Sequence, residues 1–115
     1  MSALNFQKQF AALVQSGQKR QTIRATRKQP IKVGERLYLF TGMRTKACRN
    51  LRTATCRKVC GVELTANSIK IDGVLMSRME FDDFARDDGF EHYHQMRLWF
   101  EKNHGFPFTG QIICW

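Results

Sequence analysis

The sequence predicts an α+β fold in which a curled, mostly antiparallel sheet or small β-barrel is flanked by α-helices. Apolar residues recur at helical spacing near the N-terminus and again in the last third of the chain, whereas strand formers dominate the middle and the C-terminal end. An order of one helix, several strands, two helices and a final strand is that of an α+β architecture. The 115 residues are 43% hydrophobic and 25% charged, as in a folded chain, so we expect one domain over residues 1–115.

The first predicted element is an amphipathic helix at residues 5–16. Its apolar residues recur at helical spacing between polar ones: Phe6, Phe10, Leu13 and Val14. Gly17 follows directly, and glycine readily adopts the left-handed conformation found just past the end of a helix. The helix is therefore expected to end here.

A flexible turn, an amine and a guanidinium follow one another in the motif Gly17-x-Lys19-x4-Arg24. Residues 21–25 favour a short strand. Because side chains alternate along a strand, Thr22 and Arg24 would share one face and Ile23 would point to the core. The motif is therefore expected to form one wall of a ligand cleft.

Three further segments predict the strands at the centre of the chain. Residues 36–41 are rich in strand formers, and because their apolar residues run together we expect a strand covered on both sides. Residues 48–62 alternate well enough for one long or bent strand. Residues 68–72 and 74–76 flank Asp72-Gly73, a dipeptide typical of tight hairpin turns.

Two helices and a closing strand are predicted for the remainder. Ser77 and Glu80 have the spacing of a capping box, so a helix is expected to begin there and to end at Gly89. A further helix is expected over residues 91–103. Residues 109–115 are expected to form the last strand.

Positive charge is concentrated in the first half of the chain. Residues 1–62 carry 14 lysines and arginines and one acid, whereas residues 63–115 carry five cations and nine acids. Such a field attracts polyanions, of which nucleic acid is the commonest, although the same charge also keeps a protein in solution. Cations interleaved with Tyr38 and Phe40 would form a phosphate-tracking groove: Arg24, Arg44, Lys46, Arg49 and Arg52. We expect these cations to face solvent and Phe40 to be buried.

The sequence contains no pattern for a membrane, a disulfide framework or a metal. No apolar run is long enough for a membrane span, and residues 1–14 lack the core of a signal peptide, so a cytoplasmic location is expected. Zinc would require Cys56 and Cys60 to be joined by histidines from elsewhere, and no Cys-x2-Cys pair occurs. We expect no cofactor, no metal, and four reduced, inert thiols, at Cys48, Cys56, Cys60 and Cys114.

Two groups have the surroundings needed for acid–base chemistry. Lys19 has several cations nearby in sequence, and like charges together with burial lower the pKa of an amine. Asp87 and Asp88 lie at the expected negative end of a helix and repel each other, which raises a carboxyl pKa. The alternatives are a solvated lysine that binds phosphate and a polar helix end.

The motif Gly17-x-Lys19-x4-Arg24, followed by a strand, a turn, a strand and a closing strand, resembles the ASCH domain family. The resemblance covers nearly the whole chain and implies a small β-barrel related to the PUA RNA-binding fold. Residues 22–24, 30–34 and 38–46 are similar to a branch of short, single-domain bacterial and phage members.

The resemblance implies two classes of function. Members are inferred to bind RNA in a cleft beside the motif, one bacterial branch hydrolyses N4-acetylcytidine and related acylated cytidines, and a ribonuclease activity is reported for another. In the amidohydrolase branch a lysine, a threonine and a glutamate serve catalysis. Lys19 and Thr22 match the first two in register, and Asp88 is the best match to the acid, with Asp87 the second. An aspartate is one methylene shorter than the glutamate of that pattern.

The large basic surface and the aspartate favour a binding module for RNA or a nucleotide. Its expected ligand-binding residues are Gly17, Lys19, Arg24, Arg27, Tyr38, Arg44, Lys46 and Arg49. The alternative is a small amidohydrolase that deacylates N4-acetylcytidine-type nucleosides. In that case Lys19 would activate water or the acyl carbon, Thr22 would orient the substrate and Asp88 would move protons.

Overall fold

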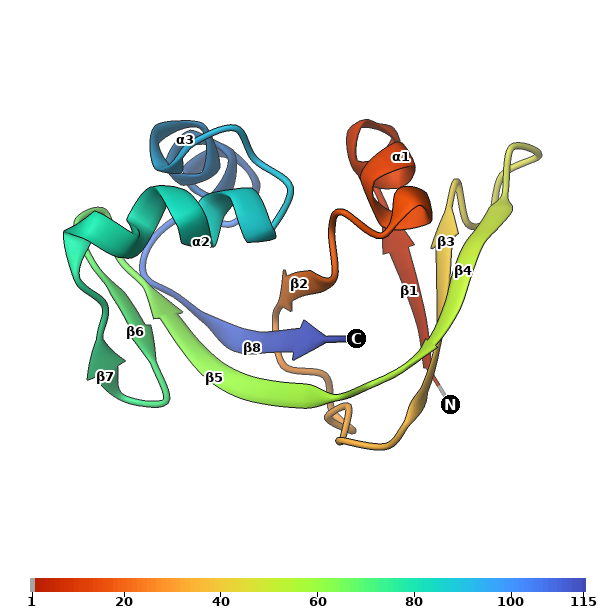
Figure 1. Ribbon diagram of the computed structural model, residues 1–115, viewed down its shortest axis with the longest axis horizontal. Coiled ribbons are helices and arrows are strands. Elements are labelled where there is room, and N and C mark those ends of the chain that lie inside the picture. The colour runs from red at the N-terminus through yellow and green to blue at the C-terminus, as the bar shows by residue number, and fades with distance from the viewer. Residues whose placement is uncertain (1) are drawn as a thin grey trace.

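The computed structural model describes residues 2–115, which form an α+β fold of helices packed on two sheets (Figure 1). In chain order the elements are β1 (Ser2–Phe6), α1 (Lys8–Ser16), β2 (Gln21–Arg24), β3 (Arg36–Thr41), β4 (Arg49–Thr55), β5 (Lys58–Leu64), β6 (Ile69–Ile71), β7 (Val74–Leu75), a 3₁₀ turn (Arg78–Glu80), α2 (Phe81–Asp87), α3 (Tyr93–Asn103) and β8 (Phe108–Cys114). The predicted α+β class is confirmed.

The strands are divided between two sheets. The first sheet has the order β1-β3-β4, with β1 parallel to β3 and β4 antiparallel to it. The second has the order β2-β8-β5-β6-β7, and all of its neighbouring strands are antiparallel. The strand pairing is thus mostly antiparallel, as predicted, but it is divided between two sheets instead of one, and the described strands do not close into a barrel.

The start of the chain differs from the prediction, because residues 2–6 form a strand, which includes Asn5 and Phe6 of the helix predicted at residues 5–16. Leu4 and Phe6 are buried while Asn5 between them is exposed, which is the alternation of a strand. This strand pairs with β3, more than 30 residues away. The helical spacing of Phe6 and Phe10 is therefore coincidental, and α1 begins at Lys8.

The predicted long strand at residues 48–62 is two strands that belong to different sheets. The chain leaves the first sheet at Thr55 and enters the second at Lys58. Between them Cys56 is buried, and its backbone exchanges hydrogen bonds with Gly34 and Glu35. Figure 1 shows the resulting curved band, in which β4 continues into β5 beneath the helices.

The strand predicted at residues 36–41 is confirmed as β3, but only one of its faces is fully covered. Leu37 and Leu39 are completely buried, whereas Tyr38 and Phe40 are half-buried. Helix α1 packs on the first sheet and contacts β3 and β4. The expectation that Phe40 is buried is therefore wrong, because the Tyr38/Phe40 face is the less covered one.

The later elements agree with the sequence patterns. The hairpin of β6 and β7 turns at Asp72 and Gly73, both with positive φ. The Ser77 hydroxyl accepts from the Met79 backbone N–H at 3.3 Å, although a 3₁₀ turn precedes α2. Gly89, with φ of +95°, follows the end of α2.

All three helices lie on the same side of the sheets in Figure 1, with α1 over the first sheet and α2 and α3 over the second. One hydrophobic core joins both halves; its fully buried side chains include Leu4, Leu37, Leu39, Ile69, Met96, Phe100 and Ile113. The segment that leads from α1 to β2 passes between α1 and the α2–α3 pair. The Lys19 motif is therefore central to the molecule.

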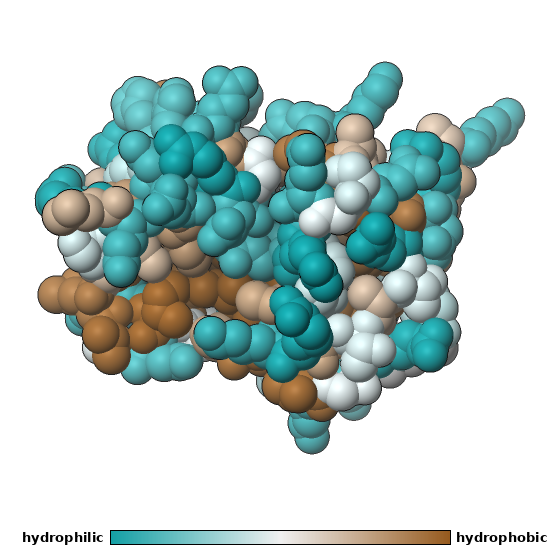
Figure 2. Space-filling model, viewed as in Figure 1, coloured by the Kyte–Doolittle hydropathy of each residue, from teal (hydrophilic) through white to brown (hydrophobic). Residues whose placement is uncertain are grey.

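Most of the face seen in Figure 2 is hydrophilic. The apolar area at the lower left lies where Figure 1 draws the β6–β7 hairpin, and there Val74 and Leu75 are 69% and 62% exposed. Within residues 2–115, no helix combines the length and apolar character that crossing a bilayer requires.

Candidate active site

Three polar or charged side chains are buried among the described residues, and they are Lys19, Thr22 and Asp88. They are 3%, 5% and 4% exposed. Removing a charged or polar group from water costs free energy unless partners compensate it, so such groups are seldom buried. The three residues that the sequence pattern singled out for catalysis are thus the ones with the most unusual surroundings.

Two glycines allow Lys19 to enter the interior. Gly17 ends α1 with φ of +86°, and the Lys19 backbone N–H then donates to the carbonyl of Leu13 at 3.0 Å. On the opposite wall, a Cβ at Gly89 would lie 3.0 Å from Lys19 Cδ and 3.0 Å from Phe10 Cδ1. Gly89 is therefore required both for its left-handed backbone and for the space that the lysine stem occupies.

Lys19 and Asp88 form a buried ion pair. Lys19 Nζ lies 3.2 Å from Asp88 Oδ1 and also donates to the backbone carbonyl of Asp88. The ring centroids of Phe10 and Phe6 are 5.1 and 5.9 Å from the same nitrogen. The aspartate thus reaches the amine despite being shorter than a glutamate, and aromatic faces complete the cation's surroundings.

Burial shifts both partners of this pair toward their neutral forms. It lowers the pKa of the Lys19 amine, while the Asp88 carboxylate opposes that shift and the positive charge of Arg24 adds to it. It raises the pKa of the Asp88 carboxyl, against which Lys19, Gln21 and Arg24 act. A proton can therefore move between or through these groups at lower cost than between an ordinary lysine and aspartate.

Thr22 and Arg24 lie on the same face of β2, as predicted, and Ile23 is buried on the other. Arg24 Nε donates to Thr22 Oγ1 at 3.0 Å, and Arg24 Nη2 donates to the backbone carbonyl of Asn5 at 2.6 Å. Burial, with a smaller contribution from the charge of Arg27, lowers the pKa of Arg24 to about 10. Arg24 is therefore a cation at neutral pH.

A cavity of about 270 Å³ brings these residues together. Lys19, Thr22, Arg24 and Asp88 supply its charged and hydroxyl groups. Its other walls include the rings of Phe6, Phe10, Phe90, Trp99, Phe100 and His104. Polar groups converging in an aromatic chamber are the usual form of a small-molecule site.

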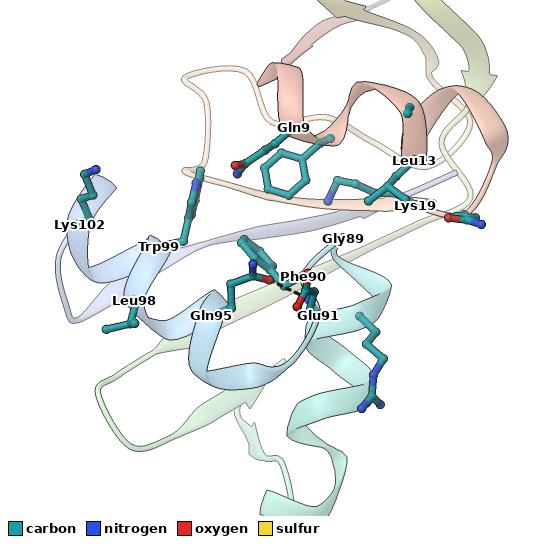
Figure 3. Close-up of a pocket in the computed structure, with 14 residues that line it drawn as sticks. Gln9, Leu13, Lys19, Gly89, Phe90, Glu91, Gln95, Leu98, Trp99 and Lys102 are labelled. Carbon is teal, nitrogen blue, oxygen red and sulfur yellow. Dashed lines mark hydrogen bonds between the residues drawn. The ribbon is translucent and has the colours of Figure 1, made fainter.

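A larger cavity of about 820 Å³ adjoins this chamber, and the two share Phe10, Lys19, Phe90 and Trp99. Figure 3 shows Lys19 pointing from the segment after α1 toward the loop of Gly89 and Phe90, while Trp99 reaches in from α3. Lys19 thus lies where the inner chamber meets the outer one.

The other residues predicted to bind a ligand lie outside the 270 Å³ chamber. Gly17 forms the turn behind Lys19, and Arg27 is exposed, with Nη2 donating to the carbonyl of Ala3. Arg44 and Lys46 are exposed in the loop before β4 and Arg49 is exposed at its start, whereas Tyr38 is half-buried on β3. Asp87, the second match to the family's acid, is exposed.

Sequence reasoning missed the aromatic walls. Trp99 of α3 and Phe90, which directly follows Asp88-Gly89, both line the chamber, although neither of them was assigned to a site from the sequence. His104, which was also assigned to no site from the sequence, lines the chamber, and burial together with the charge of Arg24 lowers its pKa. Among residues 2–115, no three His, Cys, Asp or Glu side chains cluster as metal ligands would.

The site unites an amine and a carboxyl shifted toward neutrality with a hydroxyl that already accepts one hydrogen bond. Such a set can move a proton and donate a hydrogen bond to a carbonyl oxygen.

Comparisons of the chain with known protein families, with curated protein sequences and with solved structures found no match.

Proposed function

We propose that this protein is a small amidohydrolase of the ASCH family, with a PUA-like fold, that removes the acyl group from N4-acylated cytidines. The observation that carries the proposal is the joint burial of Lys19, Thr22 and Asp88 around one cavity. The same three positions match the catalytic lysine, threonine and acid in the family resemblance. The sequence favours a binding module, and the geometry of this site favours the enzyme.

The contacts support a distinct role for each of the three residues. Lys19 passes its extra proton to Asp88 across their contact, and the neutral amine then takes a proton from water, whose oxygen attacks the acyl carbon. The hydroxyl of Thr22 donates to the acyl oxygen as negative charge develops there. Asp88 shares a proton with Lys19 through their 3.2 Å contact, and the pair then protonates the leaving N4 nitrogen. The products are a carboxylic acid and cytidine, and the enzyme recovers its starting protonation state.

The shape of the cavity supports a single modified base as the reacting group. A chamber of about 270 Å³ lies near the lower end of the sizes usual for small-molecule sites. Its aromatic walls can stack on a planar base. The remainder of a nucleoside can extend into the outer cavity past Lys19, which lines both spaces.

The direct test is incubation with N4-acetylcytidine, followed by chromatographic measurement of cytidine and acetate. We expect Lys19→Met, Thr22→Val and Asp88→Asn each to lower the rate by at least about 100-fold, as expected for loss of an acid–base or oxyanion group. Lys58→Met is the matched control, because Lys58 is exposed on β5. Circular dichroism of each variant checks that it folds.

The proposal fails if the wild-type protein releases neither the free acid nor the matching deacylated product, cytosine, cytidine or deoxycytidine, from a panel of the three N4-acylated compounds. It also fails if Lys19→Met and Lys58→Met have equal rates on the same substrate.

A second candidate function, RNA binding, is supported by four cations that we call the basic strip: Arg49 and Arg52 on β4, and Arg44 and Lys46 in the loop before it. The register of β4 shifts opposite Leu39/Phe40, and this irregularity brings Arg49 and Arg52 to the same face although they are three residues apart. Both side chains donate to Gln15 at the end of α1. The strip could therefore follow a phosphate backbone outside the buried site.

A further inference from the structure

Arg24 is expected from the sequence to bind a ligand phosphate, but its guanidinium is held by groups within the protein. Nε donates to the hydroxyl of Thr22 at 3.0 Å, and Nη2 donates to the carbonyl of Asn5 at 2.6 Å. Its Cζ lies 4.8 Å from the ring centroid of Phe6. Arg24 therefore bridges β1 and β2 directly beside the candidate active site.

We propose that Arg24 is a positioning residue, which holds the Thr22 hydroxyl as a hydrogen-bond acceptor and thereby directs its proton toward the substrate. The catalytic part of this inference rests on the proposed hydrolase function. A threonine hydroxyl has one proton and two lone pairs. Because the Arg24 N–H occupies a lone pair, the Thr22 proton points elsewhere, and Thr22 lines the chamber.

The charge of Arg24 strengthens the effect of this hydrogen bond. A hydrogen bond from a cation polarises the hydroxyl and makes it a better donor to an oxygen that gains negative charge. That oxygen is the acyl oxygen in the tetrahedral intermediate, where a donor fixed in advance is most useful. The benefit is therefore expected in kcat more than in KM.

The position calls for an arginine in particular. A planar guanidinium presents Nε and Nη2 at a fixed separation and can stack its face on Phe6 at the same time, whereas an ammonium offers no fixed geometry. The backbone is fixed as well, because Arg24 pairs with Gln111 of β8. A Cβ at Gly110 would lie 2.2 Å from the carbonyl oxygen of Arg24, so this close approach requires glycine there.

Arg24 also acts on its charged neighbours. The groups around it are Arg27 in the loop after β2, Lys19 after α1, Asp88 at the end of α2 and His104 at the end of α3. Its positive charge lowers the pKa of Lys19. A neutral replacement therefore moves the pH at which the Lys19 amine becomes neutral upward, whereas a lysine replacement preserves the charge.

These two effects are separated by comparing Arg24→Gln with Arg24→Lys. Arg24→Gln is expected to lower kcat for N4-acetylcytidine about 10- to 100-fold, as for loss of a charge-assisted hydrogen bond, with KM within about twofold. In this variant, the increase of kcat with pH is expected to occur at higher pH than in the wild type. Arg24→Lys keeps the wild-type pH profile but not the wild-type kcat. Arg57→Gln, exposed between β4 and β5, is the control.

A double-mutant cycle tests whether Arg24 acts through Thr22. In a Thr22→Val background, Arg24→Gln is expected to reduce kcat by less than about twofold more, because the shared hydrogen bond is already absent; kcat is compared on the alkaline plateau, where the effect of Arg24 on the Lys19 pKa no longer changes the rate. Additive effects would show that Arg24 acts independently of Thr22 and would overturn the inference.

An NMR measurement that does not depend on catalysis tests the positioning role of Arg24 separately from the proposed hydrolase function. Three-bond NMR couplings to the Thr22 methyl carbon report whether its χ1 angle has one value. We expect one rotamer in the wild type and averaged couplings in both Arg24 variants. If both variants keep the wild-type couplings, the positioning role is overturned even if hydrolysis is observed. If the wild type is inactive but both variants show averaged couplings, only the proposed hydrolase function is overturned. If Arg24→Gln does not fold, Arg24→Lys alone decides.

Discussion

Replacing Asp88 with asparagine tests the buried ion pair most directly. The change keeps the size of the side chain but removes the charge that faces Lys19 Nζ at 3.2 Å. Breaking a buried pair by removing one partner commonly costs about 3–5 kcal/mol, because it leaves a charge in the interior without compensation. Lys19 still donates to the Asp88 backbone carbonyl and still faces two phenylalanine rings. We therefore expect a loss at the low end, about 3 kcal/mol.

The loss is large enough to measure in several ways. For a chain of 115 residues, about 3 kcal/mol corresponds to a fall in Tm of roughly 12 °C. Urea unfolding gives the free energy of unfolding directly. Asp87→Asn is the matched control, since Asp87 is the adjacent residue of α2 and is exposed. It is expected to change stability by no more than about 0.5 kcal/mol.

The pH dependence of the loss has a definite sign. Burial lowers the pKa of Lys19 below its ordinary value of 10.5, and the Asp88 carboxylate opposes this, so its removal lowers the pKa further. Between that lowered pKa and 10.5 the unfolded chain binds more protons than the folded one, so stability rises with pH. The loss of stability in Asp88→Asn is therefore expected to shrink as the pH rises from neutral toward 10.5, the ordinary pKa of a lysine.

Two results would refute this reasoning. One is an Asp88→Asn variant as stable as Asp87→Asn at neutral pH, which would mean that the pair is solvated. The other is a deficit that stays constant or grows toward alkaline pH.

Two further outcomes are expected. Gly89→Ala should lower the free energy of unfolding by about 1–3 kcal/mol and also reduce hydrolysis, because the residue has positive φ and its Cβ would lie 3.0 Å from Lys19 Cδ. The control is Gly73→Ala, which has positive φ but nothing within 4 Å and should therefore lower stability without lowering activity. Equal hydrolysis rates for the two variants would contradict this. If the basic strip binds RNA, a double variant with Arg49→Gln and Arg52→Gln should bind single-stranded RNA more weakly in fluorescence anisotropy. The slope of log K against log salt concentration should fall by roughly one for each phosphate that is no longer neutralised, whereas Lys58→Gln should change neither quantity. An unchanged slope in the double variant would exclude the strip as the RNA-binding surface.

Local signals predicted most of the elements after the first helix. The Asp72-Gly73 turn, the Ser77 cap and the positive φ of Gly17 and Gly89 depend on backbone preferences and hydrogen bonds within a few residues. Such interactions are encoded nearby in the chain, so they can be read without knowing the fold. The face shared by Thr22 and Arg24 followed from the alternation of a strand in the same way.

Predictions that depended on distant pairing were less successful. Residues 2–6 form a strand because β3 provides a pairing partner, and nothing within those residues identifies that partner. The division of residues 48–62 between two sheets likewise depends on the hydrogen bonds of Cys56 with Gly34 and Glu35. Trp99 and His104 become cavity walls only because α3 packs beside the chain that carries Lys19.

The sequence by itself determined the α+β class, the uneven charge and the residue types at Lys19, Thr22 and Asp88. Only the tertiary structure decided that these three are buried, that Lys19 meets a carboxylate 69 residues away, and that Arg24 faces Thr22 instead of solvent. Burial and the pKa shifts that follow from it are produced when distant segments exclude water from the same space. The identity of a residue is local, but its protonation chemistry depends on what the rest of the fold packs around it.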